Sequence, residues 1–198
     1  MTSRGCTVWV TGLPASGKRT LAQSIGQALA QQSIPYELID SGKLRETLLG
    51  NTIGFTPEER NANCHRNAFV ASLLAKNGVI AVVSSVSPYK ATRDAIREES
   101  GDFIEVWVST PKSVCIDQDE KGMWAKALAG EISGFTGVDA PYEAPENAEV
   151  AVDLSETSVE SAVESVLQVL EGQGYIPADV QEQAVEPEPA PQGFGYAD

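Results

Sequence analysis

Short apolar runs rich in β-branched residues alternate along this chain with longer segments whose apolar residues recur at helical spacing. The short runs predict five strands, at residues 7–10, 36–39, 79–84, 103–108 and 150–154. Helical spacing predicts helices between them, among which are residues 21–30, 60–76 and 89–100. A last helix is expected over residues 156–171, capped by Ser155, with an apolar stripe of Val159, Val163, Val166 and Leu170. Strands that alternate with helices predict an α/β fold, a parallel sheet with helices on both faces.

The loop after the first predicted strand reads GLPASGKRT from Gly12 to Thr20. It follows the P-loop pattern G-x-x-x-x-G-K-[ST], in which backbone N–H groups surround phosphates and the lysine reaches the outer ones. The last position of the pattern normally carries a hydroxyl that ligates Mg²⁺, but here it is Arg19. A strand before the loop and a helix after it direct the helix N-terminus at the anion. We therefore expect a P-loop NTPase-type sheet whose loop binds nucleotide phosphates through Gly12, Ser16, Gly17, Lys18, Arg19 and Thr20, and we assign no metal ligand.

Charge is distributed unevenly over the 198 residues, which carry a formal net charge of −14. From residue 127 onward there are 15 acidic side chains and no Lys, Arg or His, so the first 126 residues are nearly neutral. No basic stripe exists that would neutralise a nucleic-acid backbone, and no stretch is long and apolar enough to span a bilayer. Three scattered cysteines are typical of a reduced, cytoplasmic protein.

The composition predicts two parts. Residues 1–176 form one domain, and residues 177–198, rich in Pro, Glu, Gln and Ala, form a disordered acidic tail. The end of the tail, residues 193–196, is a candidate docking peptide for a protein partner, and a tail that only aids solubility is the alternative.

Further segments of the chain resemble the adenylylsulfate kinase family. They are GFTPEERNAN at 54–63, SSVSPY at 84–89, FIEVWV at 103–108 and GEISGFTGVDAPYEAPEN at 130–147. This family transfers the γ-phosphate of ATP to the 3′-hydroxyl of adenosine 5′-phosphosulfate during sulfate assimilation. The resemblance extends over about residues 4–176 and implies that ATP, Mg²⁺ and adenylylsulfate are ligands. A homodimer is one candidate assembly, and the sequence leaves the oligomeric state open.

The resemblance also implies roles for particular residues. It assigns the adenylylsulfate pocket to Arg45, Phe55, Arg60, Asn63, Val86, Ser87 and Phe135. The two phenylalanines have flat faces suited to stacking on adenine, and the arginines are fixed donors for phosphate and sulfate oxygens. Lys18, Asp40 and Ser87 are the candidate catalytic residues; Ser87 matches a serine of the family that is marked as a phosphoserine, although we favour a role in the turn before Pro88. Residues 121–137 are expected to be a mobile lid.

The departures from the family pattern lie mainly on the ATP side. Besides Arg19, the family's Asp-Gly-Asp-Asn is here Asp40-Ser41-Gly42-Lys43, so that the second carboxylate is missing. Family arginine and lysine positions near and in the lid carry Gln118, Ala125, Leu128 and Ser133. Because phosphoryl transfer depends on positioning and charge neutralisation, these losses weaken catalysis unless the charges of Arg19 and Lys43 compensate for them. An arginine has no lone pair to ligate a metal, so the replacement favours metal-free anion binding.

Three functions stay open at this point. The chain is an adenylylsulfate kinase with an unusual metal site, a pseudokinase that binds adenylylsulfate or a nucleotide as a sensor or partner module, or a kinase for another nucleotide such as cytidine diphosphoramidate. The intact set of Arg45, Phe55, Arg60, Asn63 and Phe135 argues against the third.

Overall fold

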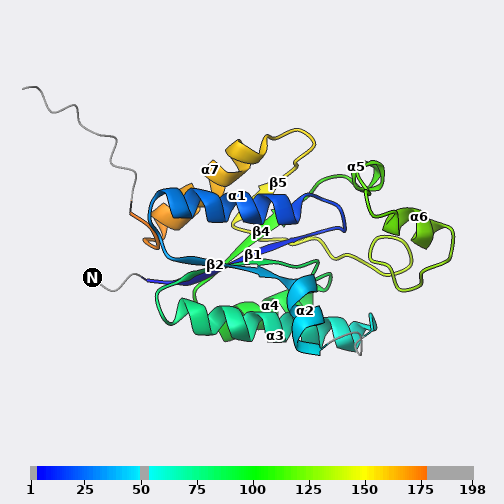
Figure 1. Ribbon diagram of the computed structural model, residues 1–198, viewed down its shortest axis with the longest axis horizontal. Helices are drawn as coiled ribbons and strands as arrows, with labels where there is room; N and C mark the ends of the chain where they lie inside the picture. The colour runs from blue at the N-terminus through cyan, green and yellow to red at the C-terminus, as the bar shows by residue number, and fades with distance from the viewer. Residues whose placement is uncertain (1–3, 50–53, 178–198) are drawn as a thin grey trace, which may run out of the picture.

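A computed structural model describes residues 4–49 and 54–177 (Figure 1). Its centre is a five-stranded sheet with the order β2-β3-β1-β4-β5, in which every pairing is parallel. The strands are β1 (Cys6–Gly12), β2 (Tyr36–Asp40), β3 (Ile80–Ser84), β4 (Phe103–Val108) and β5 (Val150–Val152). The α/β class predicted from the sequence is therefore confirmed.

Helices cover both faces of the sheet. α1 (Lys18–Gln31) and α7 (Val159–Gly172) lie on one face, and α3 (Pro57–Ala75) and α4 (Lys90–Ser100) lie on the other (Figure 1). Alternate residues of β1 serve the two faces, since Val8 packs with α1 and α7 whereas Trp9 packs with α3 and α4. The three short helices are α2 (Ser41–Leu49), α5 (Lys112–Asp117) and α6 (Met123–Leu128).

Two helix starts differ from the sequence prediction. α3 begins earlier than expected, because Thr56 and Glu59 form a capping box and Pro57 occupies the first turn. α7 begins later, and the expectation that Ser155 caps it is wrong: Ser158 accepts the Ser161 N–H instead. The side chain of Asp153 accepts the Ser155 N–H and hydroxyl in the preceding turn.

The chain stays packed into the core up to Ile176, which is buried together with Tyr175 beside α1 and α7. The predicted tail lies outside the described residues except for Pro177. Within the described ranges, no helix combines the length and the apolar character needed to cross a membrane.

Candidate active site

The candidate residues collect at the carboxyl edge of the sheet. The P-loop follows β1, Asp40 ends β2, Ser87 follows β3, and the lid segment follows β4. All strands are parallel, so these ends meet at one edge. The strand order reverses at β1, because β2 and β3 lie on one side of it and β4 and β5 lie on the other. Open α/β sheets bind ligands at such a switch point.

The P-loop is wound tightly around its own lysine. Lys18 is buried, and its Nζ donates to the Leu13 carbonyl at 2.5 Å and to Ser16 Oγ at 3.4 Å. Burial lowers the pKa of the Lys18 ammonium to about 8. Gly17 has a φ of 92°, and a Cβ there would lie 2.7 Å from Leu154 Cδ1, so the glycine of the motif is required by the backbone. A buried ammonium held only by neutral oxygens favours an anionic ligand above the loop.

Arg19 turns away from the loop toward the end of β2. Its Nη2 lies 2.6 Å from Asp40 Oδ2, and the guanidinium side chain is 58% exposed. The other carboxylate oxygen, Oδ1, accepts the N–H groups of Gly42 and Lys43 at 3.0 and 3.1 Å. Asp40 therefore holds the start of α2 with one oxygen and Arg19 with the other.

These residues do not fit a magnesium ion. P-loop kinases hold Mg²⁺ through a hydroxyl of the loop and a carboxylate, but Arg19 replaces the hydroxyl and both oxygens of Asp40 already have partners. Gly42 offers no side chain, and the described residues contain no cluster of three or more His, Cys, Asp or Glu side chains able to hold a metal. The site carries its own cation instead.

Two arginines surround the exposed ring of Phe55. The guanidinium carbons of Arg45 and Arg60 lie 4.1 and 5.4 Å from the ring centroid, and the Phe55 side chain is 54% exposed. Arg60 also donates to the Phe55 carbonyl at 2.8 Å, to Thr136 Oγ1 at 3.1 Å and to the Gly134 carbonyl. Burial lowers the pKa of Arg60. Arg60 thus connects the start of α3 to the lid beside an aromatic face and a second positive charge.

The side chains of Asn63 and Phe135 have other partners than that cluster. Asn63 Nδ2 donates to Ser41 Oγ at 2.9 Å, beside Asn67, and so binds α3 to the start of α2. The ring of Phe135 is buried and meets Trp124 edge-on, with centroids 5.1 Å apart, in a small core that includes Cys115. Their contacts with a nucleotide remain predictions.

Ser87 lies beneath the site. It is 2% exposed, its Oγ accepts from Trp9 Nε1 at 2.9 Å and donates to Thr11 Oγ1 at 3.0 Å, and its φ is 37°. Thr11 in turn bonds the Val86 carbonyl and the Tyr142 hydroxyl. These contacts favour the turn interpretation of Ser87, since no face of the side chain is open to a phosphate donor.

Two residues that the sequence analysis did not single out fix the lid: Trp124 within it contacts the P-loop, and Asp139 just after it binds the lid's own backbone. Trp124 Nε1 donates to the Pro14 carbonyl at 3.1 Å, and Asp139 accepts the N–H groups of Gly134 and Phe135, both at 2.6 Å. Those two hydrogen bonds lower the pKa of Asp139.

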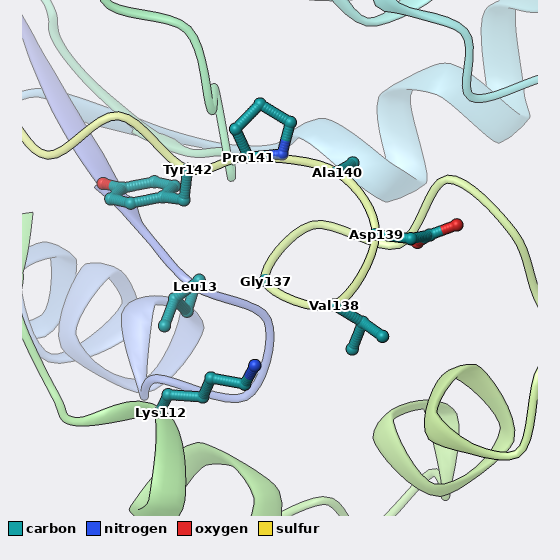
Figure 2. A pocket seen from close by; sticks show the side chains of 8 residues that line it. All are labelled: Leu13, Lys112, Gly137, Val138, Asp139, Ala140, Pro141 and Tyr142. Carbon is teal, nitrogen blue, oxygen red and sulfur yellow. The ribbon is translucent and has the colours of Figure 1, made fainter.

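A cavity of about 450 Å³ lies between the P-loop and the lid. Figure 2 shows the Leu13 and Lys112 side chains on one side and the loop of residues 137–142 on the other. Gly137 has a φ of 95°, and a Cβ there would lie 2.6 Å from Trp124 Cη2. Leu13 is the P-loop residue that lines this cavity. Together, the sheet order, the P-loop and the lid define a P-loop nucleotide phosphotransferase.

Comparisons with known proteins give the family. Residues 4–153 match the adenylylsulphate kinase family. The chain is 43% identical over 176 residues to the adenylyl-sulfate kinase of Synechococcus sp. strain JA-3-3Ab, covering 89% of this chain and 99% of the relative. The relative from Halothermothrix orenii is 42% identical over 179 residues, covering 89% of this chain and 96% of its own. The chain belongs to the adenylylsulfate kinase family.

A solved structure is similar throughout the fold. The Mycobacterium tuberculosis APS kinase CysC, in complex with AMPPNP and APS, superposes with a TM-score of 0.80 at 36% identity, covering 85% of this chain and 99% of that one. The resemblance inferred from the segments between Gly54 and Asn147 is thereby confirmed at the level of family and fold.

Proposed function

We propose that this chain transfers the γ-phosphoryl group of ATP to the 3′-hydroxyl of adenosine 5′-phosphosulfate. The observation that carries the proposal is the cluster of Arg45 and Arg60 around the exposed ring of Phe55, at the same sheet edge as the P-loop. The ring offers a stacking face for adenine, and the two guanidiniums offer donors for the phosphosulfate oxygens. The similar Mycobacterium tuberculosis structure, described as a complex with AMPPNP and APS, supports the same pair of ligands.

In the proposed reaction, the acceptor 3′-oxygen attacks the γ-phosphorus while the bond to the β–γ bridging oxygen breaks, and ADP leaves. Lys18 gives up its two neutral partners to bind phosphate oxygens. The hydroxyl proton passes to Asp40, whose Oδ2 becomes free when Arg19 moves to the phosphates. Catalysis of this kind depends on positioning and charge neutralisation, so the side chains that carry charge matter most.

The lid supports the proposal by excluding water. Trp124 fastens it to the P-loop through the Pro14 carbonyl, and Arg60 fastens it to the start of α3 through Gly134 and Thr136. A lid held at both binding sites closes over two nucleotides at once, which protects the phosphoryl group from hydrolysis.

A second candidate function, binding without turnover, is favoured by the Arg19–Asp40 ion pair. This pair uses the one carboxylate that remains at the end of β2, and a lost electrostatic group typically costs about 2.7–4 kcal/mol of transition-state stabilisation. Two such losses slow transfer by about 10⁴-fold or more unless they are compensated. In that case the chain retains the scaffold as a sensor or as a partner module.

A coupled assay of the purified chain with ATP and adenylylsulfate tests the two candidates. Turnover at about 1–100 s⁻¹, the usual range for kinases, supports the kinase, and calorimetric binding of adenylylsulfate without turnover supports the binding module. Arg19→Ser/Gly42→Asp, which restores the family's residue types, is the matched gain-of-function control. Failure to bind adenylylsulfate contradicts both, and cytidine diphosphoramidate is then tested as the acceptor.

We also propose a cytoplasmic homo-oligomer, with the acidic tail available to a protein partner. The three cysteines are free and buried, which suits a reducing compartment. A structure from Thiobacillus denitrificans that is 29% identical over 88% of this chain is described as a hexameric APS kinase, although this chain spans only 30% of that protein. Light scattering of the purified chain, with and without residues 177–198, tests the assembly.

A further inference from the structure

The phosphate site contains a positive charge where its fold class uses a metal. Arg19 is the second residue of α1, directly after the P-loop lysine, and its guanidinium lies 2.6 Å from the only side-chain carboxylate that ends β2. The second oxygen of Asp40 is held by the Gly42 and Lys43 N–H groups. A divalent ion at this point would have to break the ion pair and remain beside the displaced guanidinium, whose charge has the same sign.

We infer that Arg19 is the resident cation of the phosphate site and that the chain binds the phosphates of ATP and ADP as free anions rather than as magnesium chelates. This inference rests on the ATP half of the proposed function. It assigns to Arg19 the charge neutralisation that Mg²⁺ supplies in other P-loop kinases.

The geometry allows Arg19 to change partners. The ion pair with Asp40 is more than half exposed on the arginine side, so it is weakly held and screened by solvent. Arg19, Asp40 and Lys43 also line a cavity of about 470 Å³ between α1, β2 and α2, which leaves the long side chain room to rotate. A guanidinium binds two phosphate oxygens at once through parallel N–H groups, whereas Asp40 gives it a single close contact.

The inference predicts the sign of the magnesium effect. When a P-loop holds Mg²⁺, chelation of the nucleotide strengthens binding, because the metal links phosphate oxygens to the hydroxyl and carboxylate of the protein. Here Arg19 repels a chelated ion, and both oxygens of Asp40 already have partners. Free ADP should therefore bind at least as tightly as magnesium ADP.

The experiment is calorimetric titration of the full chain with ADP, in excess EDTA and in excess MgCl₂. For the wild type, we expect magnesium to leave the Kd unchanged or to weaken binding. Arg19→Ser should weaken binding in EDTA by about tenfold and recover part of it with magnesium, because the hydroxyl restores a metal ligand. Arg19→Lys, which keeps the charge without the planar fork, should fall between the two.

Arg4→Ser is the matched control. Its guanidinium is also more than half exposed and forms one ion pair, 2.5 Å from Asp102, but Asp102 precedes β4 and so lies at the opposite edge of the sheet. We expect this variant to bind ADP as the wild type does in both buffers.

Binding of ADP by the wild type that strengthens about tenfold or more with magnesium overturns the inference, as does an Arg19→Ser variant with unchanged affinity in EDTA. Absence of ADP binding in both buffers also overturns it. Titration with adenylylsulfate in the same calorimeter separates this result from a failure of the proposed function. If adenylylsulfate still binds, only the inference about the ATP phosphates fails, since the acceptor pocket does not involve Arg19. The wild type alone shows whether magnesium strengthens or weakens ADP binding, so the test does not depend on the variants folding.

Discussion

The buried ion pair between α4 and β4 gives the sharpest stability prediction. Arg93 is 3% exposed, and its Nε donates to Glu105 Oε1 at 2.8 Å. Its other two nitrogens donate to the Ser87 carbonyl at 2.8 Å and to the Glu143 carbonyl at 2.6 Å. One side chain therefore satisfies a buried carboxylate and two backbone acceptors, one in the segment after β3 and one in the segment before β5.

The substitution Arg93→Met keeps an unbranched stem of similar shape but removes all three hydrogen bonds. Loss of one partner from a buried pair costs about 3–5 kcal/mol, because the remaining charge is left uncompensated. Arg97 Nη2 stays 3.4 Å from Glu105 Oε2 and offsets part of that cost, so we expect about 3 kcal/mol. Since domains are typically stable by about 5–15 kcal/mol, the variant should fold with a clearly lower urea midpoint.

Urea unfolding at neutral pH, followed by circular dichroism, measures this change. The second variant is Arg93→Met/Glu105→Leu, which also removes the buried charge and should recover part of the lost stability. Arg4→Met, which breaks an exposed pair with Asp102, should leave the midpoint nearly unchanged. A loss below about 1 kcal/mol for the single variant, or a double variant less stable than the single one, would refute the reasoning.

Substitutions of Lys18, Ser87 and Phe55 each change one measurable property. Burial lowers the pKa of Lys18 to about 8, below its ordinary value of 10.5. Between these two pH values the unfolded chain binds more protons than the folded one, so Lys18 makes the free energy of unfolding rise with pH. Lys18→Met should reduce that rise in urea unfolding measured as a function of pH. Ser87→Ala removes the acceptor of the Trp9 N–H and should cost about 1–3 kcal/mol by the same assay. Phe55→Ala should leave stability almost unchanged, because the ring is exposed, but weaken calorimetric adenylylsulfate binding about tenfold, the value of one aromatic stack.

The sequence predicted the strands well because their signal is local. Runs such as residues 80–83 are continuously apolar, which is typical of a parallel sheet covered on both faces. The strand ends were less accurate: β1 continues to Gly12 because Thr11 and Gly12 pair with β4, a contact set by the tertiary structure. The start of α7 was missed for a related reason, because Ser155 and Ser158 are both good caps and the turn at Asp153 decides between them.

The site was predictable in its residues but less so in its contacts. The P-loop pattern located Lys18 and exposed the exception at Arg19, because both are defined by spacing along the chain. The partner of Arg19 was not predictable. Arg19 lies at the start of α1 and Asp40 at the end of β2, and only the tertiary structure brings them together. The edge contact between Phe135 and Trp124 was missed in the same way, because no local pattern specifies which ring fills the core of the lid.

Charge balance connects the two departures at the end of β2. In the family pattern, two aspartates and one Mg²⁺ sum to zero, and here the Asp40–Arg19 ion pair also sums to zero, while Lys43 adds one further positive charge. Arg19 alone, with both carboxylates kept, would leave a net negative site, and loss of the second carboxylate alone would leave a metal-bound site with a net positive charge. A Cβ at Gly42 would lie 3.3 Å from Asp40 Oδ1, so an aspartate there requires a small shift of the Asp40 carboxylate and adds a second negative charge beside it. Arg19 and Gly42 are therefore one coupled replacement, in which a covalently attached cation takes the place of a metal together with the carboxylate that the metal required.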